Sequence, residues 1–186
     1  MDSTYFKLVV SGSVNSGKTT FVRTISEIEP ITTDEYASEE SVKVLKGQTT
    51  VAMDYGKKTV DTDVILHIYA TPGQERFNFM WDVLVEGAFG VIFLADSTDM
   101  ESIHNTKKII RYFTEKFHYM PYLLCVTKLD MPNSVGYQQV VKLIDKSELF
   151  SIACNNTNQN EVRTALITLL TLAIDKAQSA MSAVKN

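Results

Sequence analysis

The chain has 186 residues, of which 45% are hydrophobic, and its formal net charge at pH 7 is −4. This length suits one domain with a single core, and the negative charge provides no general attraction to nucleic acid or anionic lipid. Cys125 and Cys154 have no pair spacing and are expected to be reduced thiols of an intracellular protein. We find no signal peptide, membrane span or lipidation motif and therefore expect a cytoplasmic protein without a lipid anchor.

Strand-like and helix-like segments alternate along the chain, which predicts an α/β fold with a mostly parallel sheet and helices on both faces. The first strand is expected at about Tyr5–Ser11. A helix at about Gly17–Glu29 follows and ends at Pro30. Residues 31–47 are polar, acidic and weakly patterned, and they predict a long loop.

Two strands are expected next, at Thr49–Tyr55 and Val64–Tyr69, with a hairpin turn at Gly56-Lys57-Lys58. The remaining expected elements are strands at 89–95, 122–126 and 150–154 and helices at 102–117, 136–146 and 161–180. The last helix carries an apolar stripe at helical spacing: Val162, Leu166, Leu169, Leu170, Ala173 and Ile174. This stripe predicts ordinary core packing rather than a membrane or partner helix.

The segment between the first strand and the first helix, Gly12-Ser13-Val14-Asn15-Ser16-Gly17-Lys18-Thr19, is a complete G-x-x-x-x-G-K-[ST] loop. Backbone N–H groups of such a loop converge on phosphate oxygens, and the dipole of the following helix favours their charge. Lys18 would reach the β- and γ-phosphates, and the Thr19 hydroxyl would be a ligand of Mg²⁺. The residues expected to bind nucleotide here are Val14, Asn15, Ser16, Gly17, Lys18, Thr19 and Thr20.

Thr127-Lys128-Leu129-Asp130 directly follows a buried strand, so it lies at the edge where ligands bind in open α/β sheets. The Asp130 carboxylate can accept from both N1–H and the exocyclic amine of guanine, and adenine offers no such pair of donors. The stem of Lys128 can lie along the purine face. Together with the upstream phosphate-binding loop, this segment predicts guanine selection and argues against an ATP-using kinase.

Thr71-Pro72-Gly73-Gln74 follows the third strand. Gly73 can place its backbone N–H against a γ-phosphate, and Gln74 can orient the attacking water; without the phosphate-binding loop, Pro-Gly would indicate only a turn. Lys18 and Gln74 are therefore the expected catalytic residues. Thr50 can give its hydroxyl to Mg²⁺, although β-propensity also explains threonines at the start of a strand.

The order of these motifs resembles that of the Ras-like small GTPases, and the resemblance covers essentially the whole chain. Within that superfamily, the segment Thr71–Phe77 followed by Phe79-Met80-Trp81-Asp82 looks most like the prokaryotic branch. That branch includes the gliding-motility GTPases and the GTPases encoded beside roadblock-domain proteins. The resemblance implies one small GTPase domain over residues 1–186, with an extended switch I loop at about 30–48. It also implies a GTP/GDP switch that uses Mg²⁺ and is regulated by roadblock/LC7 or longin-type proteins, without nucleic acid.

Four features depart from the family pattern. Switch I is longer than in Ras and Rab proteins, and Val14 stands at a position that is Gly in Ras. Ala70 stands where Ras and Rab have an Asp that contacts Mg²⁺ through water. The base-contacting S-A-K is not evident, and Asn155-Asn156-Thr157 and Ile152-Ala153-Cys154 are alternative registers for it. Val14 and Ala70 predict slow hydrolysis, and they favour the alternative of a GTP-dependent scaffold that barely turns over.

Phe77, Phe79, Met80 and Trp81 form an apolar cluster directly after Gln74. This cluster fits helix packing, and it equally fits a partner-binding surface that the γ-phosphate rearranges. The sequence leaves both interpretations open.

Overall fold

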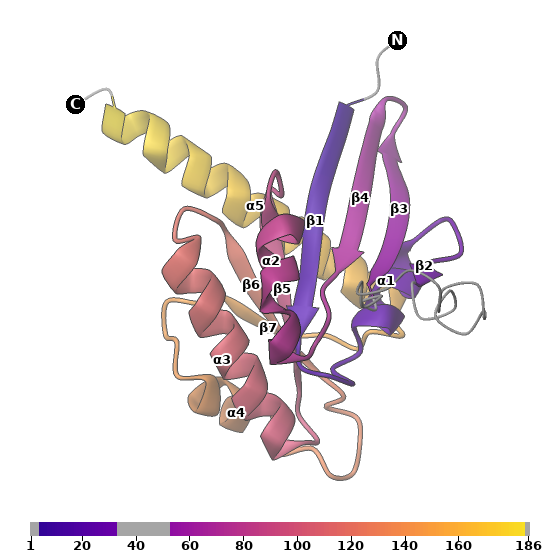
Figure 1. Cartoon of the computed structure of the whole chain (residues 1–186), viewed down its shortest axis with the longest axis vertical. Coiled ribbons are helices and arrows are strands. Elements are labelled where there is room, and N and C mark those ends of the chain that lie inside the picture. The colour runs from indigo at the N-terminus through magenta and orange to yellow at the C-terminus, as the bar shows by residue number, and fades with distance from the viewer. Residues whose placement is uncertain (1–3, 33–52, 185–186) are drawn as a thin grey trace, which may run out of the picture.

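The computed structural model describes residues 4–32 and 53–184 and places them in a sheet with helices on both faces (Figure 1). The sheet has the strand order β2-β3-β4-β1-β5-β6-β7. The strands are β1 Thr4–Gly12, β2 Ile31–Thr32, β3 Asp54–Asp61, β4 Val64–Ala70, β5 Gly90–Asp96, β6 Tyr122–Thr127 and β7 Ser151–Ala153. β1, β4, β5, β6 and β7 are parallel, and β3 runs antiparallel to β4. The predicted α/β fold is confirmed, with the two-residue β2 added at the edge beside β3.

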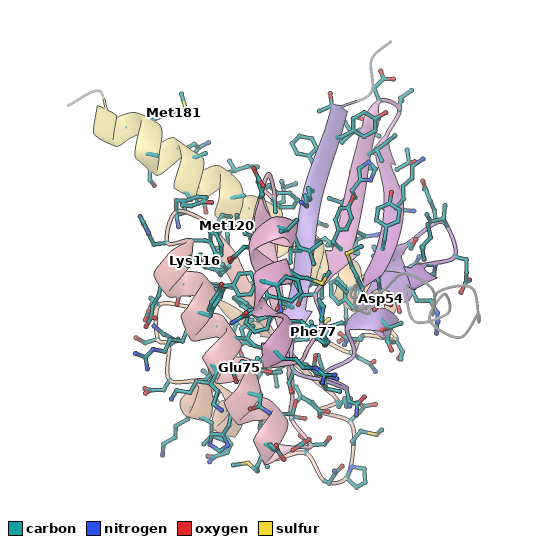
Figure 2. The ribbon with its side chains drawn as sticks, in the orientation of Figure 1. Asp54, Glu75, Phe77, Lys116, Met120 and Met181 are labelled. Carbon is teal, nitrogen blue, oxygen red and sulfur yellow. The ribbon has the colours of Figure 1, made fainter. Side chains whose placement is uncertain are left out.

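Five α-helices flank the sheet in the described residues: α1 Lys18–Ile25, α2 Asn78–Val85, α3 Met100–Lys116, α4 Tyr137–Ile144 and α5 Gln159–Val184. In Figure 1, α2 and α3 lie in front of the sheet and α5 crosses behind it. A short 3₁₀ turn, Glu75–Phe77, leads into α2 (Figure 2). Asp99 caps α3, because its carboxylate accepts from the N–H groups of Glu101 and Ser102.

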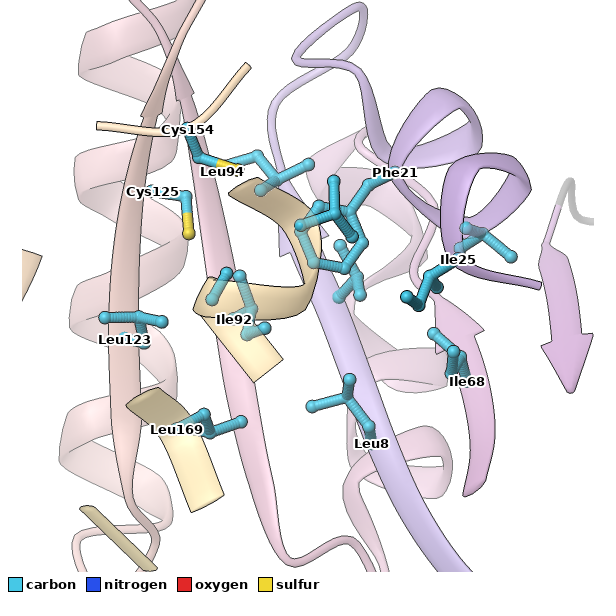
Figure 3. Close-up of a cluster of buried hydrophobic side chains, with 14 of the residues drawn as sticks. Leu8, Phe21, Ile25, Ile68, Ile92, Leu94, Leu123, Cys125, Cys154 and Leu169 are labelled. Carbon is cyan, nitrogen blue, oxygen red and sulfur yellow. The ribbon is translucent and has the colours of Figure 1, made fainter. Parts of the chain in front are cut away.

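The core consists of two apolar layers, one on each face of the sheet. Successive residues of a strand point to opposite faces, so in β1 Leu8 and Val10 join one layer and Val9 joins the other. The first layer packs against α1 and α5, and Figure 3 shows Phe21, Ile92 and Leu169 within it. The second layer packs against α2, α3 and α4. The sheet is thereby held rigidly from both sides, which fixes the ends of its parallel strands.

The predicted hairpin turn at Gly56-Lys57-Lys58 is wrong, because these residues lie inside β3 and pair with β4. The chain reverses instead between Asp61 and Val64. Gly56 is buried where a Cβ atom would meet Val22 of α1 at 2.7 Å, so this glycine permits close packing rather than a turn. α1 is also shorter than predicted, because Ser26 adopts an extended conformation after Ile25.

The last helix departs from its predicted role. Val162, Ala165 and Leu169 are fully buried against the sheet, whereas Leu170 and Ile174 are about half exposed. The prediction of core packing is therefore wrong for the outer part of the stripe. None of the helices in residues 4–32 and 53–184 is long and apolar enough to cross a membrane.

Ile31 and Thr32, the first residues of the predicted loop at 31–47, form β2, so the prediction of a loop is wrong there. The rest of that loop, most of the expected switch I region at 30–48, and Thr50 lie outside the described residues.

Candidate functional site

The phosphate-binding loop connects the end of β1 to the start of α1 at the carboxyl edge of the sheet. Gly12 has a φ of 149°, and a Cβ atom there would come within 2.5 Å of the Leu94 carbonyl oxygen. Gly17 has a φ of 95°, and a Cβ atom would collide with the Asn156 amide. Both positions therefore require glycine. β1 lies between β4 and β5, and this is the place in such sheets where the connections diverge and ligands bind.

Lys18 closes the loop on itself. Its Nζ donates to the carbonyl oxygens of Gly12 at 3.0 Å and Ser13 at 2.6 Å. Burial lowers the pKa of Lys18 to about 8, against the opposing influence of the Asp54 carboxylate. A cation held inside a ring of backbone groups at the N-terminus of a helix is suited to bind an anion.

Thr19 and Asp54 form a link between α1 and β3 that sequence reasoning missed. The Thr19 hydroxyl donates to Asp54 Oδ2 at 2.6 Å, and Figure 2 shows Asp54 at the end of β3 nearest α1. Asp54 pairs with Ala70 across the antiparallel β3–β4 ladder. A carboxylate therefore stands directly opposite position 70, on the neighbouring strand.

This arrangement suits a hard divalent cation such as Mg²⁺. The Thr19 hydroxyl directs its proton to Asp54, so its lone pairs remain available to a metal ion. An oxygen ligand that is itself hydrogen-bonded to a carboxylate is typical of metal sites. No cluster of three or more His, Cys, Asp or Glu side chains that could hold a metal occurs in the part of the chain that the structure describes. The protein alone thus offers a partial site, which phosphate oxygens would complete.

The loop after β4 lies against the phosphate-binding loop. A Cβ atom on Gly73 would come within 2.6 Å of the Val14 nitrogen and 2.8 Å of Lys18 Nζ, so only glycine allows this approach. The Thr71 hydroxyl shares a hydrogen bond of 2.8 Å with Ser11. The buried Trp81 indole donates to the Pro72 carbonyl at 3.0 Å and anchors the loop to α2.

The apolar cluster after Gln74 divides between the core and the surface. Trp81 is buried and stacks on Phe113, with ring centroids 5.7 Å apart, which agrees with helix packing. Phe79, in contrast, is 58% exposed.

A cavity of about 540 Å³ between α2 and α3 opens at one end onto Val14, Gly73 and Gln74. Val14 and Gln74 are both exposed, and both line this cavity. Lys18 and Asp130 do not line this cavity. It therefore approaches the phosphate-binding loop from the side of α3 rather than from the side of the expected base.

The end of β6 is fastened to the phosphate-binding loop. The Thr127 hydroxyl lies 3.3 Å from the Ser16 carbonyl oxygen, and Lys128 Nζ donates to the Asn15 carbonyl at 2.8 Å. Lys128 also forms an ion pair of 2.5 Å with Asp96, the last residue of β5. Burial alone raises the pKa of Asp96, but hydrogen bonds from Lys128 and Thr98 outweigh it and lower the pKa overall.

Asp130 is exposed just beyond this anchored lysine. The Asp130 carboxylate makes no hydrogen bond or ion pair within residues 4–32 and 53–184, so both of its oxygens can accept from a ligand. The sequence did not predict the ion pair between Lys128 and Asp96, because this contact requires β5 and β6 to end side by side. The pairing of Asp96 with Thr127 shows that they do.

The loop after β7 contributes Asn155 and Asn156. The Asn156 side chain is buried and donates to the carbonyl oxygens of Ser16 at 3.4 Å and Gly17 at 3.2 Å. Asn155 Oδ1 accepts from the N–H of Thr157, and its own N–H donates to Glu161. In the alternative register, Ile152 and Ala153 belong to β7 itself. The segment 155–157 is therefore the one that forms the loop beside the phosphate-binding residues.

The predicted site residues thus fall into three groups. One group forms the phosphate-binding loop and the first turn of α1: Val14, Asn15, Ser16, Gly17, Lys18, Thr19 and Thr20. A second group meets that loop from the ends of other strands: Gly73, Thr127, Lys128 and Asn156. Gln74, Asp130 and Asn155 lie beside these contacts, and Thr50 is outside the described residues.

A sequence model of the family described as "Conserved hypothetical ATP binding protein" matches residues 10–185. The chain is 33% identical over 150 residues to Uncharacterized protein MJ1339 of Methanocaldococcus jannaschii, an alignment that covers 80% of this chain and 79% of that protein. It is 28% identical over 181 residues to the GTP-binding protein YPT1 of Saccharomyces cerevisiae, covering 91% of this chain and 80% of that protein.

Among solved structures, the Arl6 BBS3 small GTPase from Trypanosoma brucei, with the bound nucleotide analogue GppNp, has a similar fold. The TM-score is 0.69 and the sequence identity 18%, and the superposition covers 93% of this chain and 99% of that one. This similarity concerns the fold.

Proposed function

We propose that this chain, which belongs to the family described as conserved hypothetical ATP-binding proteins and to the Ras-like small GTPase superfamily, is a GTP-binding molecular switch that hydrolyses GTP slowly. The observation that carries the proposal is the arrangement at the end of β6. Thr127 and Lys128 are fastened to the phosphate-binding loop, and Asp130 presents an exposed carboxylate beside them. The residues proposed to recognise the phosphates and the base are thereby held next to one another.

Lys18, Thr19 and Asp54 would bind the phosphates and their metal ion. A bound triphosphate would replace the Gly12 and Ser13 carbonyl oxygens as the partners of Lys18 Nζ. Thr19 would hold Mg²⁺ with support from Asp54, and Thr50 is the second proposed ligand. When bound, Mg²⁺ neutralises charge on the β- and γ-phosphates. Asp54 would thus act as a positioning residue through Thr19.

Gly73 and Gln74 would act on the γ-phosphate side. Gly73 already lies against Val14 and Lys18, so its N–H is close to the phosphate-binding loop. Gln74 is exposed and free to orient a water molecule for in-line attack. Trp81 holds this loop through Pro72, so a movement of the loop would be transmitted to α2, as a switch requires.

The alternative function is a GTP-dependent scaffold with little or no hydrolysis. Two departures from the family pattern favour this alternative, namely Val14 and Ala70. Asp54 is hydrogen-bonded to Thr19 and would supply the carboxylate that position 70 lacks, which leaves Val14 as the remaining support for the alternative. Val14 is 46% exposed and borders the same cavity as Gln74, where its side chain occupies space that a water or a partner's residue would need.

A regulatory partner would use the cavity between α2 and α3 to reach Gln74. Four acidic residues and two basic ones line it, namely Glu75, Asp99, Glu101, Glu115, Lys108 and Arg111. The acidic excess would attract a basic side chain such as an arginine finger, which accelerates this chemistry by about 10³–10⁵. We propose roadblock/LC7 or longin-type proteins as the partners and place the chain in the prokaryotic branch of the superfamily on its Thr71–Phe77 segment. The exposed Phe79 is the proposed contact.

Bound nucleotide identifies the function directly, because the matching family is described as ATP-binding while Asp130 favours guanine. The purified protein is incubated with an equimolar mixture of GTP and ATP in Mg²⁺, freed of unbound nucleotide, denatured and chromatographed. We expect guanine nucleotide almost exclusively, with GTP converting slowly to GDP on longer incubation. Bound adenine nucleotide would overturn the proposal.

A further inference from the structure

The outer face of α5 carries a second apolar stripe that the domain does not cover. Ile167, Leu170, Ile174, Ala177 and Met181 recur at alternating spacings of three and four residues. Ile167 is 58% exposed, Leu170 46%, Ile174 49% and Met181 65%. Alternating three- and four-residue spacing is the a/d repeat of a coiled-coil seam, in which each apolar side chain packs against a second helix.

This outer stripe is separate from the face that joins the core. Val162, Ala165 and Leu169 form the buried face, and a shift of five residues from Val162 to Ile167 turns about 140° around the helix. Figure 1 shows the C-terminal half of α5 extending past the edge of the sheet, and Figure 2 shows Met181 near its end. A second helix can therefore lie along this half without entering the domain.

We infer that the outer stripe of α5 is a homodimer interface, in which it packs against the same stripe of a second copy of this chain. The five positions that flank the stripe are uncharged: Leu166, Thr171, Ala173, Gln178 and Ala180. Charges at such positions select unlike partners and repel like ones. Their absence means that no like charges would oppose each other when two copies of the stripe meet across a two-fold axis.

The charges on this helix also disfavour a lipid surface as the occupant. Between Thr164 and Val184 the only charged residues are Asp175 and Lys176. Lys176 donates to the backbone carbonyls of His118 and Met120, so it is held against the domain. A membrane-surface helix normally carries several basic residues on its polar face. The seam from Ile167 to Met181 is short, about 21 Å at the rise of an α-helix, so the dimer should be weak and concentration-dependent.

Sedimentation equilibrium of the full chain over a concentration series tests the inference. Wild type should dimerise, and Ile174→Glu should weaken the dimer by at least about tenfold because it places a charge in the apolar seam. Ser179→Glu is the matched control, since Ser179 is exposed on the same helix but points away from the seam. Thermal unfolding should be nearly unchanged in both variants. A monomeric wild type at every concentration, or equal dimerisation of all three proteins, would overturn the inference.

Disulfide trapping locates the contact. Ile174 is the central residue of the stripe, midway between Ile167 and Met181, and it lies directly opposite its counterpart in a parallel, in-register pair. Ile174→Cys should give a covalent dimer on mild oxidation and Ser179→Cys should not, and the native Cys125 and Cys154 are buried. Failure of Ile174→Cys to crosslink above the Ser179→Cys level would contradict an α5 contact. A wild type that stays monomeric but co-sediments with phosphatidylserine vesicles would assign the stripe to lipid instead.

Discussion

Replacing Asp54 by Asn tests whether this residue supports the metal ligand Thr19. The Thr19–Asp54 hydrogen bond is 2.6 Å long and its acceptor is a carboxylate, and such a bond contributes about 1.5–3 kcal/mol. Asn keeps a neutral oxygen that can accept from Thr19, so the variant loses the contribution of the charge, roughly half of that of the bond. Each 1.4 kcal/mol corresponds to about tenfold in an equilibrium constant, so we expect the Mg²⁺ affinity of the nucleotide complex to fall about tenfold. Loss of groups that support metal ligands typically has an effect of this size.

The assay is the release rate of fluorescent GDP as a function of free Mg²⁺. Asp54→Asn should shift the midpoint to higher Mg²⁺ and leave the rate in excess EDTA unchanged, which separates metal support from nucleotide contact. Asp61→Asn is the control, because Asp61 is an exposed carboxylate at the other end of β3. The pairing of Asp54 with Ala70 also predicts that Asp54→Ala/Ala70→Asp recovers part of the Mg²⁺ dependence. If Asp54→Asn keeps the wild-type midpoint, Asp54 does not support the metal.

Two further predictions concern rate and pH. Unaided single-turnover hydrolysis should be slow, roughly 10⁻⁴ s⁻¹. Gln74→Leu should abolish stimulation by a partner, and Val14→Gly should increase the rate only when that partner is present. Fast hydrolysis by the isolated protein, or a rate unaffected by Gln74→Leu, would contradict the assigned mechanism. Lys18 binds phosphate in its charged form, and its pKa of about 8 means that this form prevails below pH 8. Calorimetric nucleotide affinity should therefore be level up to about pH 7.5 and fall towards tenfold per pH unit above 8, whereas the weaker binding of Lys18→Met should not change between pH 7 and 9.

The sheet and the phosphate-binding loop could be predicted because their signals are local. Strand β5 is a continuous apolar run, and the spacing from Gly12 to Thr19 by itself indicates a strand–loop–helix unit. Gly56 was misread because a glycine inside a strand and a glycine in a turn look alike in sequence. Only the contact with Val22 in α1 shows why it is there.

The role of Asp54 could not be predicted, because it depends on the register of two strands. The resemblance to Ras and Rab proteins pointed to the carboxylate missing at position 70, but the residue proposed to replace it lies opposite on β3 rather than nearby in the sequence. The exposed face of α5 was missed for a related reason. Leu169 and Leu170 are adjacent in an apolar helix, and only the position of the sheet determines that the first is buried and the second exposed.

The central claim, guanine selection by Asp130, is tested most directly by exchanging its carboxylate for an amide. Displacement of bound fluorescent nucleotide is measured with GDP, XDP and ADP as competitors for wild type and Asp130→Asn. Wild type should prefer GDP to ADP by a wide margin, and Asp130→Asn should lose GDP affinity and gain XDP affinity, because the amide can no longer accept from both guanine donors. Equal competition by GDP and ADP in wild type, or an unchanged preference in Asp130→Asn, would contradict the account.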